Sequence, residues 1–195
     1  MKQEIQFSLF RALTTSKPSG TVALAEVYRL ITTDASLKES TEKFRYFKQQ
    51  GFDDEADRIK RSRCLAFTPA VLFDGNRGKK NVVAYTQYSL VDIDGLEEGR
   101  AERLVQRLKD DPYWLLVYIT LSGKGLRIIF QVEGVTDGAS YLRAFFQGND
   151  HYCRLLGITD FDGQVKDDTR ASGMCHDPNA LYRSEAKVFP VYPDK

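Results

Sequence analysis

"PYWLLVYITLSGKGLRIIFQV", residues 112–132, contains two apolar segments on either side of a short turn with two glycines. Continuous apolar runs rich in β-branched and aromatic residues are typical of buried strands. SGKG (122–125) has the composition of a tight turn between them. The stretch therefore predicts two antiparallel strands, 112–121 and 126–132, and argues against a wholly parallel sheet.

The segments on either side of this hairpin complete a repeating order of strand and helix. We expect an extended segment at 81–94, helices at 97–111 and 139–157, with Gly148 weakening the second, and short strands around 171–175 and 186–192. From residue 85 onward the order is β-α-β-β-α-β. This order predicts an α+β fold with an RRM-like, or ferredoxin-like, antiparallel palm whose helices pack on one face. In that arrangement the first and third strands are neighbours at the centre of the sheet, which places 88–94 beside 126–132.

The first 80 residues are expected to add an N-terminal strand and a helical extension to this palm. The predicted elements are a strand at 4–10, a polar linker at 14–20, helices at 21–31, 36–50 and 53–61, and a buried strand at 64–73 that Pro69 interrupts. At 195 residues the chain is expected to form one domain, with 1–80 as the N-terminal part and 81–195 as the palm.

The composition of the chain bears on its charge balance and on the cellular compartment in which it is expected. The chain has 28 Lys and Arg against 27 Asp and Glu, so no overall field favours a polyanionic partner. The three cysteines, at 64, 153 and 175, are odd in number and irregular in spacing, which favours a reducing compartment. With no signal or membrane segment in view, we expect a cytoplasmic protein.

Two carboxylates, Asp92 and Asp94, end the strand predicted at 88–94 and are followed by Gly95. Alternation along a strand places both on one face, with Val91 and Ile93 on the other. Two carboxylates this close favour a cation between them, and Mg²⁺ or Mn²⁺ suits oxygen ligands. The alternative is a strand that simply ends in an Asp-Gly turn. Candidates for a third carboxylate follow the second helix: Asp160, Asp162, Asp167 and Asp168.

Two enzyme or metal motifs share this pattern in part. An EF-hand loop needs further acidic positions that Leu96 and the following residues do not supply. A D-x-D-G phosphohydrolase remains a possible function, but it uses a parallel sheet, which the predicted hairpin opposes.

The turn SGKG is a candidate phosphate site. Glycines at 123 and 125 would let backbone N–H groups point outward, while Ser122 adds a hydroxyl and Lys124 a charge. The alternative is an ordinary hairpin turn. Arg127 follows on the strand and should stand beside Asp92 on the same face. A carboxylate pair next to phosphate-binding cations is what a nucleoside triphosphate with its metal requires.

Three segments together carry a family resemblance: YSLVDIDGL (88–96), ITLSGKGLRIIFQV (119–132) and DDTRASGMCHDPNALY (167–182). With the acidic D-x-x-V at Asp162, they resemble the three motifs of the archaeo-eukaryotic primase, or primase-polymerase, superfamily. The arrangement is similar to the N-terminal domain of virulence-associated protein E proteins of phages and mobile elements. In those proteins the domain often precedes a helicase or ATPase segment, so the chain is expected to be a shortened piece of a longer protein or a standalone copy.

The resemblance implies roles for individual residues. Asp92, Asp94 and Asp162 would bind catalytic Mg²⁺ or Mn²⁺, with Asp160 as the rival of Asp162. Ser122, Gly123, Lys124 and Arg127 would hold the triphosphate, with Arg170 supporting it or the DNA template. The second motif of the superfamily usually ends in His, and this chain has Arg127 there. Arginine binds phosphate but does not shuttle protons near neutral pH.

A basic cluster, Arg58, Lys60, Arg61 and Arg63, ends the third N-terminal helix and is a candidate DNA-binding surface. Its alternative is a solvated helix face. Two functions from different classes follow. One is a nucleotidyltransferase of the primase-polymerase type, and the other is a non-catalytic DNA- or nucleotide-binding module that works with a partner helicase.

Overall fold

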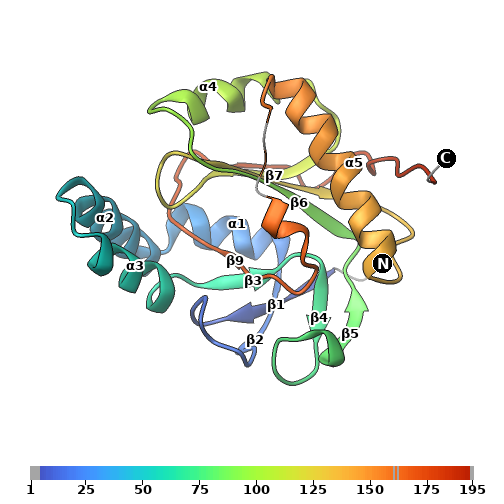
Figure 1. Cartoon of the computed structure of the whole chain (residues 1–195), viewed down its shortest axis with the longest axis horizontal. Helices are drawn as coiled ribbons and strands as arrows, with labels where there is room; N and C mark the ends of the chain where they lie inside the picture. The colour runs from blue at the N-terminus through green and yellow to red at the C-terminus, as the bar shows by residue number, and fades with distance from the viewer. Residues whose placement is uncertain (1–4, 160, 162, 194–195) are drawn as a thin grey trace.

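The computed structural model describes residues 5–159, 161 and 163–193, and its centre is a four-stranded palm sheet. The strands are β6 (Tyr88–Ile93), β7 (Trp114–Ile119), β8 (Leu126–Gln131) and β10 (Leu181–Tyr182), in the order β10-β7-β8-β6. Each pairing is antiparallel. Helices α4 (Arg100–Arg107) and α5 (Gly138–Leu156) lie on one side of this sheet (Figure 1). The α+β palm-type fold predicted from the hairpin is confirmed.

The position of the first palm strand differs from the expectation in one respect. β6 pairs with β8 as predicted, with Asp92 opposite Arg127, but it lies at an edge of the four-stranded sheet and not at its centre. The reason is that the last strand, β10, pairs with β7. At the outer edge of β6, the side-chain amide of Asn149 in α5 donates a hydrogen bond of 3.2 Å to the Leu90 carbonyl. The Asn149 side chain thus bonds to the edge of β6 with which the last strand of the predicted palm would have paired.

The two short strands expected near the C-terminus are also placed differently. The segment predicted at 171–175 forms β9 (Ser172–Gly173), which leaves the palm and pairs with β3 (Ala66–Thr68). No strand forms at 186–192, where the described chain is irregular and packs through Phe189 against the palm.

β9 completes a second four-stranded sheet, of order β2-β1-β3-β9. Its other strands are β1 (Gln6–Phe10) and β2 (Gly20–Ala23), and a two-stranded ribbon of β4 (Val71–Phe73) and β5 (Val82–Tyr85) lies beside it. The first predicted helix starts later than expected, at Leu24, because 20–23 pairs with β1. The helices are α1 (Leu24–Thr33), α2 (Ala35–Gln49) and α3 (Asp53–Ser62), with 3-10 turns η1 (Lys79–Asn81) and η2 (Gly163–Lys166).

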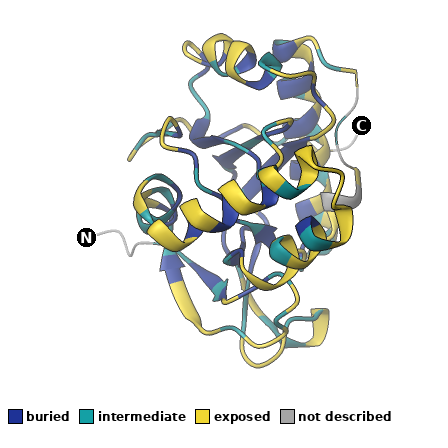
Figure 2. Cartoon of the chain, turned by 90° about the vertical axis from the view of Figure 1, so that its left-hand side faces the viewer, coloured by how far each residue is buried: buried dark blue, intermediate teal, exposed yellow. Residues whose placement is uncertain are grey.

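One continuous apolar core joins the two sheets. Phe7 of β1 contacts Tyr88 of β6 edge-on, with 5.2 Å between ring centroids, and both belong to the same cluster as the palm residues. Buried residues concentrate on the sheets, while α2 and α3 expose their outer faces (Figure 2). Among the described residues no helix has the length and apolarity to cross a membrane.

Gly148 has a packing role in α5 that its low helix propensity hides. A Cβ at this position would lie 2.1 Å from Cζ of Phe130, a fully buried residue of β8. Only a glycine allows the helix to approach the sheet this closely. The residue that weakens the helix in isolation is therefore required where the helix packs.

We expect Gly148→Ala to lower the free energy of unfolding by about 1–3 kcal/mol, because overpacking against Phe130 outweighs the better helix propensity of alanine. Urea unfolding followed by circular dichroism measures this. The double variant Gly148→Ala/Phe130→Leu should lose less stability than the sum of its two single variants, since leucine removes the close ring atom. A Gly148→Ala protein as stable as the wild type would contradict the packing role.

Candidate nucleotide and metal site

A cavity of about 170 Å³ lies between the palm and the second sheet. Four segments distant in sequence supply polar residues to its lining: the end of α3, the end of β6, the β7–β8 hairpin, and the chain at 170–174. Residues singled out in the sequence that line it are Lys60, Asp92, Asp94, Ser122, Arg127 and Arg170. The fold therefore brings together residues from all three motif segments at one site.

Asp92 and Arg127 form an ion pair at the floor of this cavity. Nη2 of Arg127 contacts Oδ2 of Asp92, and the side chains are only 12% and 8% exposed. The predicted adjacency of the two residues is confirmed by the strand register. Because both groups are buried and close, their interaction is screened little by solvent.

Three further groups fix the Arg127 guanidinium. Its Nη1 donates to the hydroxyl of Tyr118 at 3.2 Å, to Oγ of Ser172 at 2.8 Å and to the Gly173 carbonyl at 3.1 Å. Burial alone would lower the pKa of Arg127, but the neighbouring Asp92 carboxylate and Tyr118 hydroxyl raise it above the usual value. The guanidinium is therefore a permanent charge that links β8 of the palm to β9 of the second sheet.

Sequence reasoning did not find Tyr118 and Ser172. Tyr118 stands opposite Arg127 in the β7–β8 register, so the alternation of the hairpin already placed it on the face of the site. Ser172 carries no comparable signal, because its position depends on β9 joining the other sheet.

Asp94 differs from Asp92 in exposure and in its surroundings. It follows β6 and is exposed at the cavity mouth. A Cβ at Gly125 would lie 2.7 Å from Oδ1 of Asp94, 2.6 Å from the Ile93 carbonyl and 2.4 Å from Oγ1 of Thr120. The second glycine of SGKG therefore allows the turn to approach Asp94 closely.

The donor atoms of this site fit one hard cation. Oδ1 of Asp92 is buried and has no hydrogen-bond partner among the described residues, and the Asp94 carboxylate lines the same cavity. Carboxylate oxygens are the ligands that Mg²⁺ and Mn²⁺ prefer. Cys64 also lines the cavity, and burial raises the pKa of its thiol to about 11, which keeps the metal-free thiol protonated at neutral pH.

The third carboxylate is not identified within the described chain. Asp162 and its rival Asp160 lie outside the described residues. Asp167 is exposed, and its carboxylate accepts hydrogen bonds from Thr169. Asp168 is buried and accepts a hydrogen bond of 2.8 Å from Tyr85, whose pKa burial and this contact raise to about 12. In the part of the chain that the structure describes, no three His, Cys, Asp or Glu side chains are grouped for metal binding.

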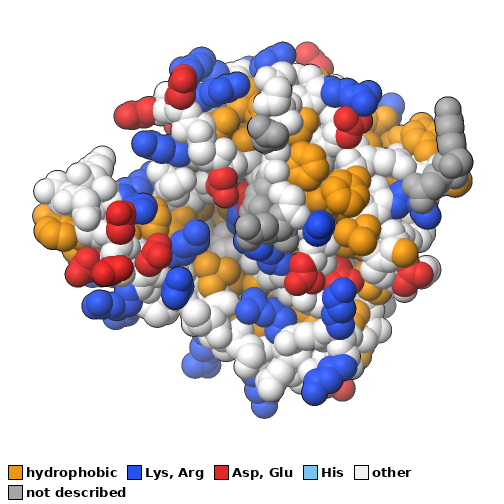
Figure 3. Space-filling view, in the orientation of Figure 1, with side chains coloured by type: hydrophobic (Ala, Val, Ile, Leu, Met, Phe, Trp, Pro, Cys, Tyr) orange, Lys and Arg blue, Asp and Glu red, His pale blue; other side chains and the backbone are white. Residues whose placement is uncertain are grey.

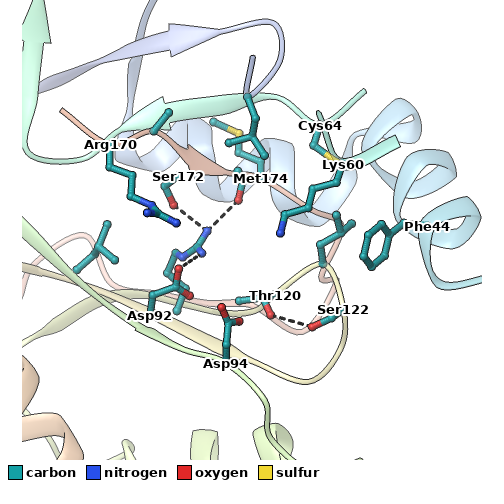
Figure 4. Close-up of a pocket in the computed structure, with 16 residues that line it drawn as sticks. Phe44, Lys60, Cys64, Asp92, Asp94, Thr120, Ser122, Arg170, Ser172 and Met174 are labelled. Atoms are coloured by element: carbon teal, nitrogen blue, oxygen red, sulfur yellow. Dashed lines mark hydrogen bonds and ion pairs between the residues drawn. The ribbon is translucent and has the colours of Figure 1, made fainter. Parts of the chain in front are cut away.

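Two cations line the wall opposite the carboxylates. Lys60 of α3 and Arg170, from the segment before β9, point into the cavity toward Asp92 and Asp94 (Figure 4). Lys60 was predicted as part of a DNA-binding cluster and lies at this site. Arg58, Arg61 and Arg63 are exposed and do not line the cavity. Lys and Arg side chains also lie along the region between the two sheets (Figure 3).

The SGKG turn offers fewer backbone N–H groups to a ligand than its sequence suggests. The N–H of Gly123 donates to the Thr120 carbonyl at 2.9 Å, and the N–H of Lys124 donates to Oγ of Ser122 at 3.2 Å. Both groups are thus used inside the turn. Lys124 is exposed and is not among the cavity-lining residues, whereas Ser122 lines the cavity. An anion here would be bound mainly by side chains.

The fold and this site define an α+β palm domain with a cavity in which Asp92 and Asp94 face Lys60 and Arg170. Residues 59–182, well over half of the chain, match the family described as BT4734-like, N-terminal domain, and the chain belongs to this family. This match does not confirm the resemblance to virulence-associated protein E proteins, which stays a prediction. Comparison with curated proteins gives no match.

Two solved structures are similar in fold. One is the primase-polymerase AEP domain of cyanophage S-2L, with a TM-score of 0.40 and 11% identity, covering 72% of this chain and 71% of that one. The other is the polymerase domain of Mycobacterium tuberculosis ligase D in complex with DNA, with a TM-score of 0.34 and 11% identity, covering 63% and 50%.

We expect Asp92→Ala to lower the free energy of unfolding by about 3–5 kcal/mol, because it leaves the buried Arg127 charge without its partner. Asp94→Ala should change it by no more than about 0.5 kcal/mol, since Asp94 is exposed. Chemical denaturation of both variants measures the difference. In Asp92→Ala/Arg127→Ala, the loss should be smaller than the sum of the single losses. Equal stability of the two single aspartate variants would rule out a structural ion pair.

Proposed function

We propose that this domain binds a nucleoside triphosphate with Mg²⁺ or Mn²⁺ and transfers the nucleotide to a 3′-hydroxyl, as primase-polymerases do. The observation that carries the proposal is the cavity itself, in which Asp92 and Asp94 face Lys60 and Arg170. A metal-bound polyphosphate presents a cation to the carboxylates and phosphate oxygens to the basic side chains.

Two unpartnered polar atoms at the floor support this ligand. Oδ1 of Asp92 and Nε of Arg127 are buried and lack a hydrogen-bond partner among the described residues. Such groups are costly unless a ligand satisfies them. A cation would satisfy the carboxylate oxygen and a phosphate oxygen would accept from Nε. An unpartnered acceptor together with an unpartnered donor fits a metal ion with its bound phosphate better than it fits a metal ion or a phosphate alone.

Each residue then has a defined task. Asp92 and Asp94 would hold the cation, Lys60 and Arg170 would neutralise phosphate oxygens, and Ser122 would donate a hydrogen bond at the turn. When bound, the cation supplies charge stabilisation at the phosphorus that is attacked and at the leaving pyrophosphate. Asp162, if it reaches the cavity, would complete the acidic set.

The finer assignments are part of the same proposal. Arg58, Arg61 and Arg63 continue from Lys60 along the exposed end of α3, so they would contact the phosphates of a DNA strand that enters the cavity. Gly123 and Lys124 would lie at the rim of the triphosphate site. The resemblance to virulence-associated protein E proteins supports a role in replication of a phage or mobile element, with a helicase or ATPase as partner.

The runner-up is a module that binds nucleotide or DNA without catalysis. The specific observation in its favour is that Arg127, where the superfamily usually has His, is engaged by Asp92, Tyr118 and Ser172. An arginine held in this way cannot exchange a proton with the reacting hydroxyl near neutral pH. In this case the site would bind the same ligands, and a partner protein would use them.

Primer extension separates the two functions. The protein is incubated with Mn²⁺, labelled nucleotides and a primed single-stranded template, and nucleotide binding is measured in parallel. We expect extension by the wild type, its loss in Asp94→Ala, and nucleotide binding weakened about tenfold or more in Lys60→Ala and Arg170→Ala, because each removes a charge-assisted contact to phosphate. Asp94→Ala is preferred to Asp92→Ala because it should keep the fold.

Matched surface variants control for these substitutions. Asp110→Ala and Lys38→Ala remove an exposed acid and an exposed lysine that do not line the cavity, and both should behave as the wild type. Nucleotide binding without extension by the wild type would select the non-catalytic module. Absence of both metal and nucleotide binding would refute both functions.

A further inference from the structure

We propose that the site holds one divalent cation and that the Arg127 guanidinium supplies the second positive charge, where a two-metal polymerase site would have another ion. The inference rests on the proposed function, because it concerns the metal of that site. It assigns Arg127 a role as a fixed counter-charge and not as a substitute for the histidine of the superfamily.

The first observation is how the oxygens of Asp92 are used. Oδ2 is occupied by Nη2 of Arg127, while Oδ1 is buried and has no partner among the described residues. A carboxylate that bridges two metal ions uses one oxygen for each. In this structure the guanidinium takes one of those positions and leaves the other for a single ion shared with Asp94.

The second observation is that the guanidinium cannot easily leave. Its Nη1 has three acceptors, the Tyr118 hydroxyl, Oγ of Ser172 and the Gly173 carbonyl, and the latter two belong to the second sheet. Moving Arg127 to admit another ion would break these bonds, two of which link β8 to β9. The charge is therefore part of the framework that shapes the cavity.

The third observation is the balance of charge. Within the described residues, the acids that line the cavity are Asp92 and Asp94, and no group of three metal-binding side chains is present. Two carboxylates, one guanidinium and one divalent cation carry a single net positive charge, to which Lys60 and Arg170 on the opposite wall add two for the triphosphate. A second divalent ion beside the guanidinium would meet a repulsion larger than that between two monovalent ions at the same separation.

Electron paramagnetic resonance of Mn²⁺ tests the inference independently of turnover. The wild-type protein is titrated with Mn²⁺ alone, and again with a non-hydrolysable nucleoside triphosphate analogue. We expect one tightly bound ion per chain in both titrations, and no exchange-coupled signal from two neighbouring ions, which in two-metal sites lie about 3.5–4 Å apart. Asp94→Ala should lose the tight ion, and Asp110→Ala should keep it.

Arg127→Gln provides the second measurement. Removal of a positive charge next to Asp92 should tighten Mn²⁺ binding by about tenfold or more, whereas a merely structural arginine would leave it equal or weaker. Arg183→Gln is the matched control, because Arg183 stacks on Trp114 and bonds two carbonyls away from the cavity. If Arg127→Gln does not fold, the number of Mn²⁺ ions bound per wild-type chain tests the inference.

The outcomes separate this inference from the function on which it rests. Two exchange-coupled ions per chain in the wild type, with extension activity present, would overturn the inference and leave the proposed function standing. Equal or weaker Mn²⁺ binding by a folded Arg127→Gln would also overturn it. No bound Mn²⁺ at all would overturn both.

Discussion

The ion pair between Asp92 and Arg127 is the interaction on which the site depends. Asp92 holds the guanidinium from β6, and Ser172 and Gly173 hold it from β9. One side chain thus connects the palm to the second sheet at the floor of the cavity. Arg127 thus contributes both to the lining of the cavity and to the contact between the two sheets.

This double role changes how substitutions at the site are to be interpreted. A buried pair contributes little net stability compared with apolar residues, but removal of one partner is strongly destabilising. Under the proposed function, loss of activity on changing Asp92 would therefore have two causes, loss of a metal ligand and loss of the fold. Asp94 is exposed on the same wall, so its substitution is expected to disturb the fold less. Lys60 and Arg170 belong to the opposite wall and are also exposed.

Much of the palm could be predicted because its signals are local. The hairpin at 112–132, the helical periodicities and the strand order were sufficient to place Asp92 beside Arg127, and the structure confirms that contact. The sequence could not show that Oδ2 of Asp92 is already used, since alternation places side chains on a face without showing which contacts they make. Lys60 was predicted to contact DNA, because the sequence of a basic cluster does not show which of its side chains points into the cavity.

The errors concern contacts between distant segments. A two-residue strand such as β9 has no periodicity of its own, and its partner is chosen by the sheet that has an edge available. β6 lies at the sheet edge because the two-residue strand β10 pairs with β7, and the sequence gives no signal for that choice of partner. Gly148 was recognised only as a weak helix former, because its contact with Phe130 exists only in the packed structure.

The pairing of β9 with β3 also has a consequence for the order in which the protein is made. A sheet that begins at residues 6–10 takes its last strand from residues 172–173, so its contact order is high. Because synthesis proceeds from the N-terminus, this sheet stays one strand short until residues 172–173 have left the ribosome. Ser172 and Gly173 hold Arg127, so the cavity floor cannot be completed before these residues are made.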